Sequence, residues 1–172
     1  ALTGDLDITG DVTINGAGAL STVIDGASID RVLEIRPGAT VHISGVTVRK
    51  GNPSGNAGGI FNQGTLTLNK SIVSNNTGAN FGGGIGNFGT MTLTNSTVRN
   101  NSPVGPNLSG GGGGIFNQGT MTLTGSTVNG NTTLGRGGAI YNLDSTLTII
   151  NSTISGNTGL NFISSPPSVF PS

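Results

Sequence analysis

The sequence repeats itself with a period of about 25 residues, and this repeat restricts the possible folds more than any other feature. Each repeat opens with two small residues, an isoleucine, a variable residue and an asparagine, as in Gly58 to Asn62. A second segment, such as Thr65 to Leu68, alternates threonine with an apolar residue, and a third, such as Ser71 to Asn76, has a central valine or isoleucine. Period-two alternation is typical of half-buried strands, so the repeat predicts three strands per coil.

One coil cannot bury its own apolar side, so the coils must stack and bring equivalent residues into columns. The isoleucines of the first segment then form one inward column: Ile60, Ile85, Ile115 and Ile140. We predict an all-β fold, a right-handed single-stranded parallel β-helix (solenoid) of about six coils of about 25 residues each. Residues 1–158 form this domain, and residues 159–172 form an extended proline-rich tail. The insertion between Asn101 and Gly112 predicts a loop that protrudes at one corner.

The charge content argues against several kinds of partner. Charged residues make up 8% of the chain, and seven basic residues balance seven acidic ones. Such a balance gives no electrostatic footprint for nucleic acid, and no apolar run is long enough for insertion into a membrane. Cysteine is absent, which removes disulfides and thiolate metal sites, and we predict no cofactor.

The repeats resemble a known group of proteins. Gly58-Gly59-Ile60 and its three successors are similar to the Gly-Gly-Ala-Ile repeats of right-handed β-helices in bacterial surface proteins, including chlamydial polymorphic outer-membrane passengers. The opening stretch from Gly4 to Gly26 looks like the first coils of large secreted proteins of filamentous and environmental bacteria. The resemblance covers residues 4–158 and implies the fold and a secreted or cell-surface location. It implies no catalytic residues.

Two sets of polar residues are candidates for metal binding or for a structural role. Eight asparagines form two columns, which we interpret as structural ladders because turn asparagines tolerate left-handed backbone and stack their amides: Asn62, Asn87, Asn117 and Asn142, then Asn76, Asn101, Asn131 and Asn157. Asp5, Asp7 and Asp11 are weak candidates for Ca²⁺ because that ion prefers carboxylate oxygens. They also fit outward strand and turn positions.

Two outward columns are candidate binding faces. Phe61, Phe116 and Tyr141, with Gly86 between them, should point away from the isoleucine column, where they either stack on sugars or other chains or are covered by nearby loops. The second face is a Thr-x-Thr lattice with hydroxyls about 6.7 Å apart along the strand and about 4.8 Å apart between coils, an arrangement that ice-binding solenoids use but that β-propensity also favours. Its members are Thr65, Thr67, Thr90, Thr92, Thr120, Thr122, Thr146 and Thr148.

The sequence offers little for catalysis. Beyond Glu34 the only acid is Asp144, and the only histidine, His42, fits an outward coil position. Polysaccharide cleavage needs clustered carboxylates, so we predict that the chain is not an enzyme. We expect a structural or adhesive module, with carbohydrate binding or cleavage and ice binding as alternatives.

Association with itself is the expected mode of assembly. We see no capping helix in the sequence, and bare coil ends recruit other chains. The partner is then a second copy in a head-to-tail oligomer or filament, or the neighbouring coils of a longer chain. Four apolar tail residues are candidate assembly contacts: Phe162, Ile163, Val169 and Phe170.

Overall fold

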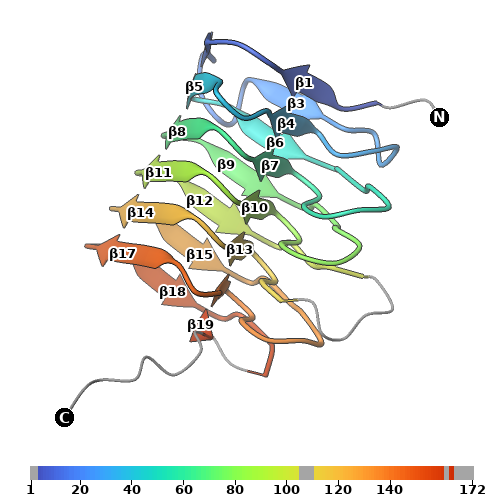
Figure 1. The fold of residues 1–172 in the computed structure, drawn as a ribbon, viewed down its shortest axis with the longest axis vertical. Coiled ribbons are helices and arrows are strands. Elements are labelled where there is room, and N and C mark those ends of the chain that lie inside the picture. Colours follow the sequence, from blue (N-terminus) through green and yellow to red (C-terminus); the bar gives the residue numbers. More distant parts are fainter. Residues whose placement is uncertain (1–3, 105–110, 161–162, 165–172) are drawn as a thin grey trace.

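The computed structural model describes residues 4–104, 111–160 and 163–164, and these residues form a solenoid of parallel strands (Figure 1). The strands make three parallel sheets, one on each side of a three-sided prism, and successive strands of the chain belong to successive sheets. The predicted all-β parallel solenoid of about six coils with three strands per coil is confirmed.

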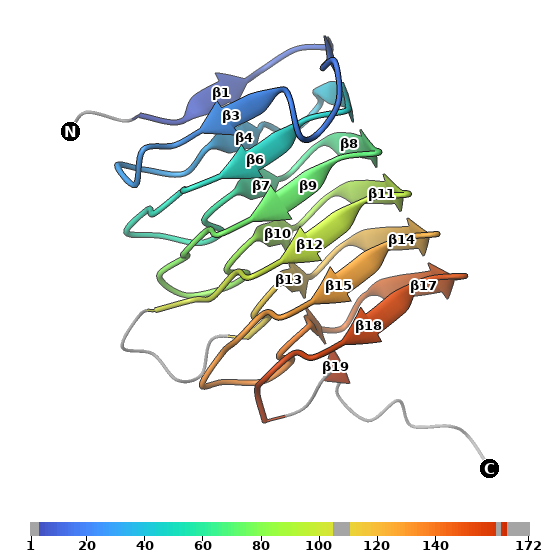
Figure 2. The ribbon, with the colours of Figure 1, turned by 180° about the vertical axis from the view of Figure 1, so that it is seen from behind.

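Sheet A has seven strands, and sheets B and C have six each. Figure 2 shows the molecule from behind, with sheet C toward the viewer. Sheet A consists of β1 (Leu6–Ile8), β4 (Leu33–Ile35), β7 (Ile60–Asn62), β10 (Ile85–Asn87), β13 (Ile115–Asn117), β16 (Ile140–Asn142) and β19 (Ile163–Ser164). Sheet B consists of β2 (Val12–Asn15), β5 (Thr40–Ser44), β8 (Thr65–Asn69), β11 (Thr90–Thr94), β14 (Thr120–Thr124) and β17 (Thr146–Ile150). Sheet C consists of β3 (Val23–Asp25), β6 (Thr47–Arg49), β9 (Ile72–Ser74), β12 (Thr97–Arg99), β15 (Thr127–Asn129) and β18 (Thr153–Ser155).

The core consists of aliphatic columns, because the strands pair with equivalent residues opposite each other. Ile85 lies between Ile60 and Ile115 in sheet A, and Leu93 lies between Leu68 and Leu123 in sheet B. These side chains are fully buried in the middle coils. Each coil therefore buries its apolar side only through its neighbours, as expected for a repeat protein.

The corners set the prism shape. Two corners of a coil begin with a residue of left-handed backbone, for example Lys70 (φ 47°) before Ser71 and Asn75 (φ 54°) before Asn76. Asparagine and glycine adopt this conformation at low cost, and Gly125 and Gly130 occupy these two corner positions in a later coil. The longest connections join sheet C to sheet A and project to one side of the prism (Figure 1). The insertion after Asn101 belongs to one of these connections, between β12 and β13.

Candidate functional site

The two predicted asparagine columns are hydrogen-bonded ladders inside the corners. In the first, each Nδ2 donates to the Oδ1 of the next coil, at 2.7 Å from Asn62 to Asn87, 2.7 Å from Asn87 to Asn117 and 2.6 Å from Asn117 to Asn142. In the second, Asn76, Asn101, Asn131 and Asn157 make the same contact at 2.9–3.0 Å. The amide stacking predicted from the sequence is therefore present, and it satisfies most of the buried amide groups; the Oδ1 of Asn62, at the start of the first ladder, is buried and has no partner among the described residues.

The predicted left-handed backbone is not at the ladder asparagines. The positive φ belongs to the residue just before each member of the second ladder, such as Asn75 (φ 54°) and Asn100 (φ 53°). The reason is that the left-handed residue turns the chain, and the residue after it can then point its side chain into the corner. The structure thus assigns the turn and the ladder to neighbouring positions.

Sequence reasoning missed a third ladder, which is built from serines. Ser71, Ser96, Ser126 and Ser152 follow one corner, and the backbone N–H of each donates to the Oγ of the next at 3.0–3.2 Å. Each Oγ in turn donates to the carbonyl two residues earlier, as Ser96 does to Thr94 at 2.9 Å. The recurrence of serine at the start of the third segment was the available signal.

The aromatic column is covered rather than exposed. Phe116 is 1% exposed and Tyr141 7%, so an exposed aromatic binding face is wrong for these two residues and the covered alternative holds for them, whereas Phe61, the third predicted residue, is half-buried. The ring centres of Phe116 and Tyr141 lie 5.7 Å apart. The ring centre of Phe116 also lies 5.4 Å from that of Phe88 and 4.7 Å from that of Phe81. The outer face of sheet A thus carries a second, smaller apolar cluster.

A loop residue and a turn residue complete that cluster. Phe81 comes from the connection between β9 and β10, and Phe88 from the turn after β10. Phe88 bridges the column across Gly86, because its ring centre lies 5.1 Å from that of Phe61 and 5.4 Å from that of Phe116, while the Phe61 ring itself closes over Gly86. The cluster ends at Arg31, whose guanidinium lies 4.9 Å from the centre of the Phe61 ring. Such a cation over a ring face stabilises the arrangement modestly.

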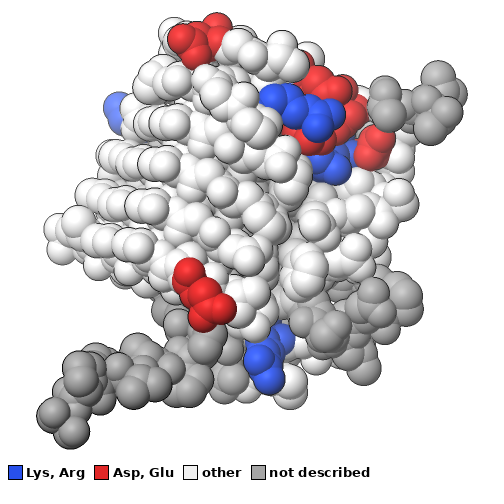
Figure 3. Space-filling view, viewed as in Figure 1, with Lys and Arg blue, Asp and Glu red and all other residues white. Residues whose placement is uncertain are grey.

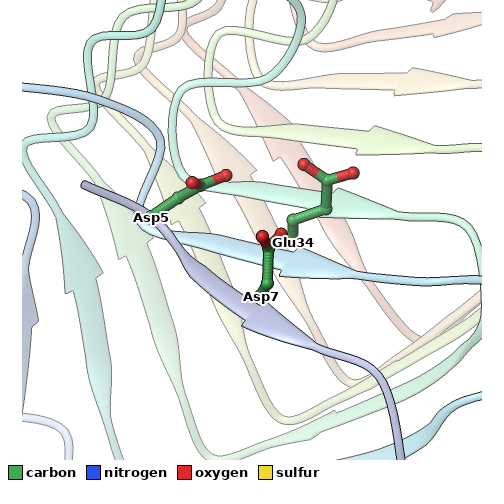
Figure 4. Close-up of side chains that lie close together, drawn as sticks. All are labelled: Asp5, Asp7 and Glu34. Carbon is green, nitrogen blue, oxygen red and sulfur yellow. The ribbon is translucent and has the colours of Figure 1, made fainter. Parts of the chain in front are cut away.

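The acidic residues near the N-terminal end form a different cluster from the predicted one. Carboxylate oxygens of Asp5, Asp7 and Glu34 lie within 4.8 Å of one another, and Figure 4 shows Asp7 on β1 beside Glu34 on β4. Asp11 is not a member, so the predicted set of Asp5, Asp7 and Asp11 is wrong. Asp11 follows the corner that leads to sheet B, where its Oδ1 accepts a hydrogen bond from the Thr40 backbone N–H at 2.9 Å.

Two arginines already occupy this cluster. Arg36 pairs with Glu34 at 2.7 Å and with Asp7 at 3.1 Å, and Arg31 pairs with Glu34 and lies 3.9 Å from Asp5. Two guanidinium charges offset most of the three carboxylate charges and occupy the space that a cation would need. The arrangement is that of an ion-pair network, and it fits Ca²⁺ poorly, since that ion takes six to eight oxygen ligands.

Besides the strand pairing of β1 with β4, β2 with β5 and β3 with β6, ion pairs join the first coil to the second. Asp25 at the end of β3 pairs with Arg49 at 2.8 Å and with Lys50 at 3.3 Å. Hydrogen bonds from the Ala27 backbone N–H and the Arg49 side chain hold the pKa of Asp25 below its usual value. Residues 1–30 contain five aspartates and no lysine or arginine, so this end of the solenoid is acidic on its own.

The threonines of sheet B lie on its outer side, as the alternation predicts. We call this surface the threonine face and define it as the outward residues of β8, β11, β14 and β17: Thr65, Thr67, Asn69, Thr90, Thr92, Thr94, Thr120, Thr122, Thr124, Thr146, Thr148 and Ile150. Between them, the residues pointing inward are buried in the three middle coils. His42 lies on the same side, aligned with Thr67, and is exposed as expected.

The end coils expose residues that are buried elsewhere. Ile149 of β17 is 38% exposed, whereas its column neighbour Leu123 is 0% exposed. At the other end Leu6 of β1 is 51% exposed, whereas its column neighbour Leu33 is 0% exposed. Of the predicted assembly tail, Ile163 belongs to β19, which pairs with β16, so strand pairing continues beyond residue 158. Phe162, Val169 and Phe170 lie outside the described residues.

Comparison with family models, with curated proteins and with solved structures gives no match. The described residues include no helix long and apolar enough to cross a membrane.

Proposed function

We propose that this chain is an extracellular structural or adhesive β-helix module of a bacterial surface, which associates end to end with further coils. Those coils come from a second copy or from a longer surface protein. The observation that supports this proposal most is the exposure of core-type residues on the two end coils. An open strand edge with exposed aliphatic residues is a template for another strand.

A second copy would continue the aliphatic columns. Through the strand register, Val12 and Ile14 of one copy would align over Leu147 and Ile149 of another in sheet B. In sheet C, Ile24 would align over Ile154 in the same way. Apolar residues would thus meet apolar residues across the contact, with burial favourable by about 25 cal/mol per Å².

Charge favours contact between unlike ends. Of the five aspartates of the first coil, Asp11 and Asp30 form no ion pair among the described residues, so two N-terminal ends would still repel each other, whereas residues 137–160 at the other end contain one acid, Asp144, and no basic residue. A contact between an N-terminal and a C-terminal end is heterologous and does not need to close, so it produces a filament.

The carbohydrate alternative gains no support from the geometry. Sugar rings bind by stacking on exposed aromatic faces, but Phe116 and Tyr141 are buried under neighbouring residues, and the half-buried Phe61 ring already contacts Arg31 and Phe88. The structural and adhesive role therefore remains the better proposal.

Light scattering and electron microscopy of the full chain at increasing concentration test self-association. We expect particle mass to rise with concentration for the natural chain. Ile149→Lys should reduce association because it places a charge in the exposed column, and Thr148→Lys on the outward side of the same strand is the matched control. Monodisperse monomers of the natural chain at high concentration would exclude self-assembly and leave only coils of a longer chain as the partner.

A further inference from the structure

The threonine face is regular in two directions. In the three middle coils, β8, β11 and β14 have nine outward positions, of which eight are threonine and one is Asn69. The register places Thr92 between Thr67 and Thr122, without any offset. Hydroxyls therefore repeat about every 6.7 Å along the strands and about every 4.8 Å between coils.

This lattice is rigid. Behind it lie leucines and methionines that are 0–1% exposed, such as Leu66, Met91 and Met121. The serine ladder fixes the corner at which each of these strands ends, as Ser71 N–H donates to Ser96 Oγ at 3.1 Å. Threonine is β-branched and stiff at χ1, so its hydroxyl and methyl groups keep defined positions on a fixed strand.

The hydroxyls of the face are free to bind a partner. The threonine hydroxyls that do form hydrogen bonds with described residues lie elsewhere, on Thr22, Thr47, Thr77 and Thr133. The face also carries no charged side chain, and Figure 3 shows the rows over β8, β11 and β14 as white, while charges gather near β1 and β4. A ligand for this surface must be neutral and rich in hydrogen-bonding groups.

General β-propensity does not account for the uniformity. The outward positions of sheet C experience the same preference for β-branched residues, yet they include Ile72, Arg49 and Arg99. The outer side of sheet A is partly covered by its own aromatic cluster. Sheet B alone presents a repeated, neutral and uncovered surface within the described part of the chain.

We propose that the threonine face binds ice. A crystalline partner matches a rigid two-dimensional lattice, and the spacings of the hydroxyls are close to the repeat distances between water oxygens on ice surfaces. Alternating hydroxyl and methyl groups hold first-layer waters in place without imposing the hydration shell of a charge. A crystalline polysaccharide is less suited, because no outward position of β8, β11, β14 or β17 is aromatic.

The test uses the full chain and two pairs of substitutions. Thr92→Tyr with Thr122→Tyr places bulky groups in the middle of the threonine face. Thr97→Tyr with Thr127→Tyr is the matched control, because these threonines are equally half-buried and lie on the outward side of sheet C in the same two coils. Circular dichroism melts establish that both variants keep the fold, and Thr92→Val provides a milder change that keeps the side-chain shape.

Thermal hysteresis, ice recrystallisation and partition into a growing ice crystal are measured for each chain. We expect activity for the natural chain and for the sheet C variant, and loss of most of it for the sheet B variant. Activity equal to that of an inert protein of the same mass would overturn the proposal, as would equal loss in both variants. Binding to crystalline cellulose or chitin, without any effect on ice, would also overturn it and would assign the face to polysaccharide.

Discussion

The buried asparagine ladder provides the sharpest test of how polar groups hold this solenoid together. Asn101 is 1% exposed, and its Oδ1 accepts from the backbone N–H and the Nδ2 of Asn76, both at 3.0 Å. Its Nδ2 donates to the Val73 carbonyl and to Asn131 Oδ1, also at 3.0 Å. Asn101→Ala removes all four hydrogen bonds and leaves the Asn76 backbone N–H without an acceptor.

The expected loss of stability follows from those contacts. An orphaned buried donor costs about 1–3 kcal/mol and three further lost hydrogen bonds about 1 kcal/mol each, so the free energy of unfolding should fall by about 4–6 kcal/mol. Urea unfolding followed by far-ultraviolet circular dichroism measures this change.

The neighbouring Asn100 is the matched control for this experiment. It is exposed, has a left-handed backbone (φ 53°), and corresponds to Gly130 of the next coil. Asn100→Gly should therefore change the free energy of unfolding by less than about 0.5 kcal/mol. If Asn101→Ala cost no more than this control, the ladder would not be a source of stability and the reasoning would be refuted.

Four further outcomes are expected. Hydrogen bonds lower the pKa of Asp25, so its ionised form stabilises the fold above its ordinary pKa, and this contribution is lost as pH falls through the folded pKa. Asp25→Asn should therefore make Tm fall less steeply as the pH is lowered into the acid range. Phe116→Ala should lower the free energy of unfolding by about 3–5 kcal/mol in urea titrations, because the ring is buried. Millimolar Ca²⁺ should leave Tm unchanged relative to Mg²⁺, since Arg36 already pairs with Glu34; a rise specific to calcium would contradict this. Pectins, alginates and glucans incubated with the protein, with and without calcium, should show no depolymerisation above buffer.

The repeat made most of the fold predictable because it fixes the strand register. Once Ile60, Ile85 and Ile115 are aligned, the alternation of each strand determines which neighbours point inward and which point outward. The asparagine columns follow from the same alignment. These features depend only on equivalent positions in successive coils, which a sequence displays directly.

Features that depend on contacts between non-equivalent positions were not predictable in this way. Phe88 joins the rings of Phe61 and Phe116 across Gly86 although it lies in a turn, where other coils have glutamine or leucine. Asp5 and Asp7 meet Glu34 of the next coil, whereas Asp11 belongs to another side of the prism. Nearness in sequence suggested three aspartates, but the corner after β1 separates them in space.

Polar residues in this chain divide into two sets with different physical roles, and the division explains why few charges suffice. Asparagines and serines in the corners form hydrogen bonds with their own kind in the next coil, so they satisfy buried groups without ionic partners. The side-chain hydroxyls of the threonine face form no hydrogen bond with a described residue and are available to a ligand in the solvent. Changes to the first set should therefore alter stability, and changes to the second should alter binding while the fold persists. The comparison of Asn101→Ala with Thr92→Tyr separates these two roles, because each substitution should change one measured property and leave the other unchanged in folded protein.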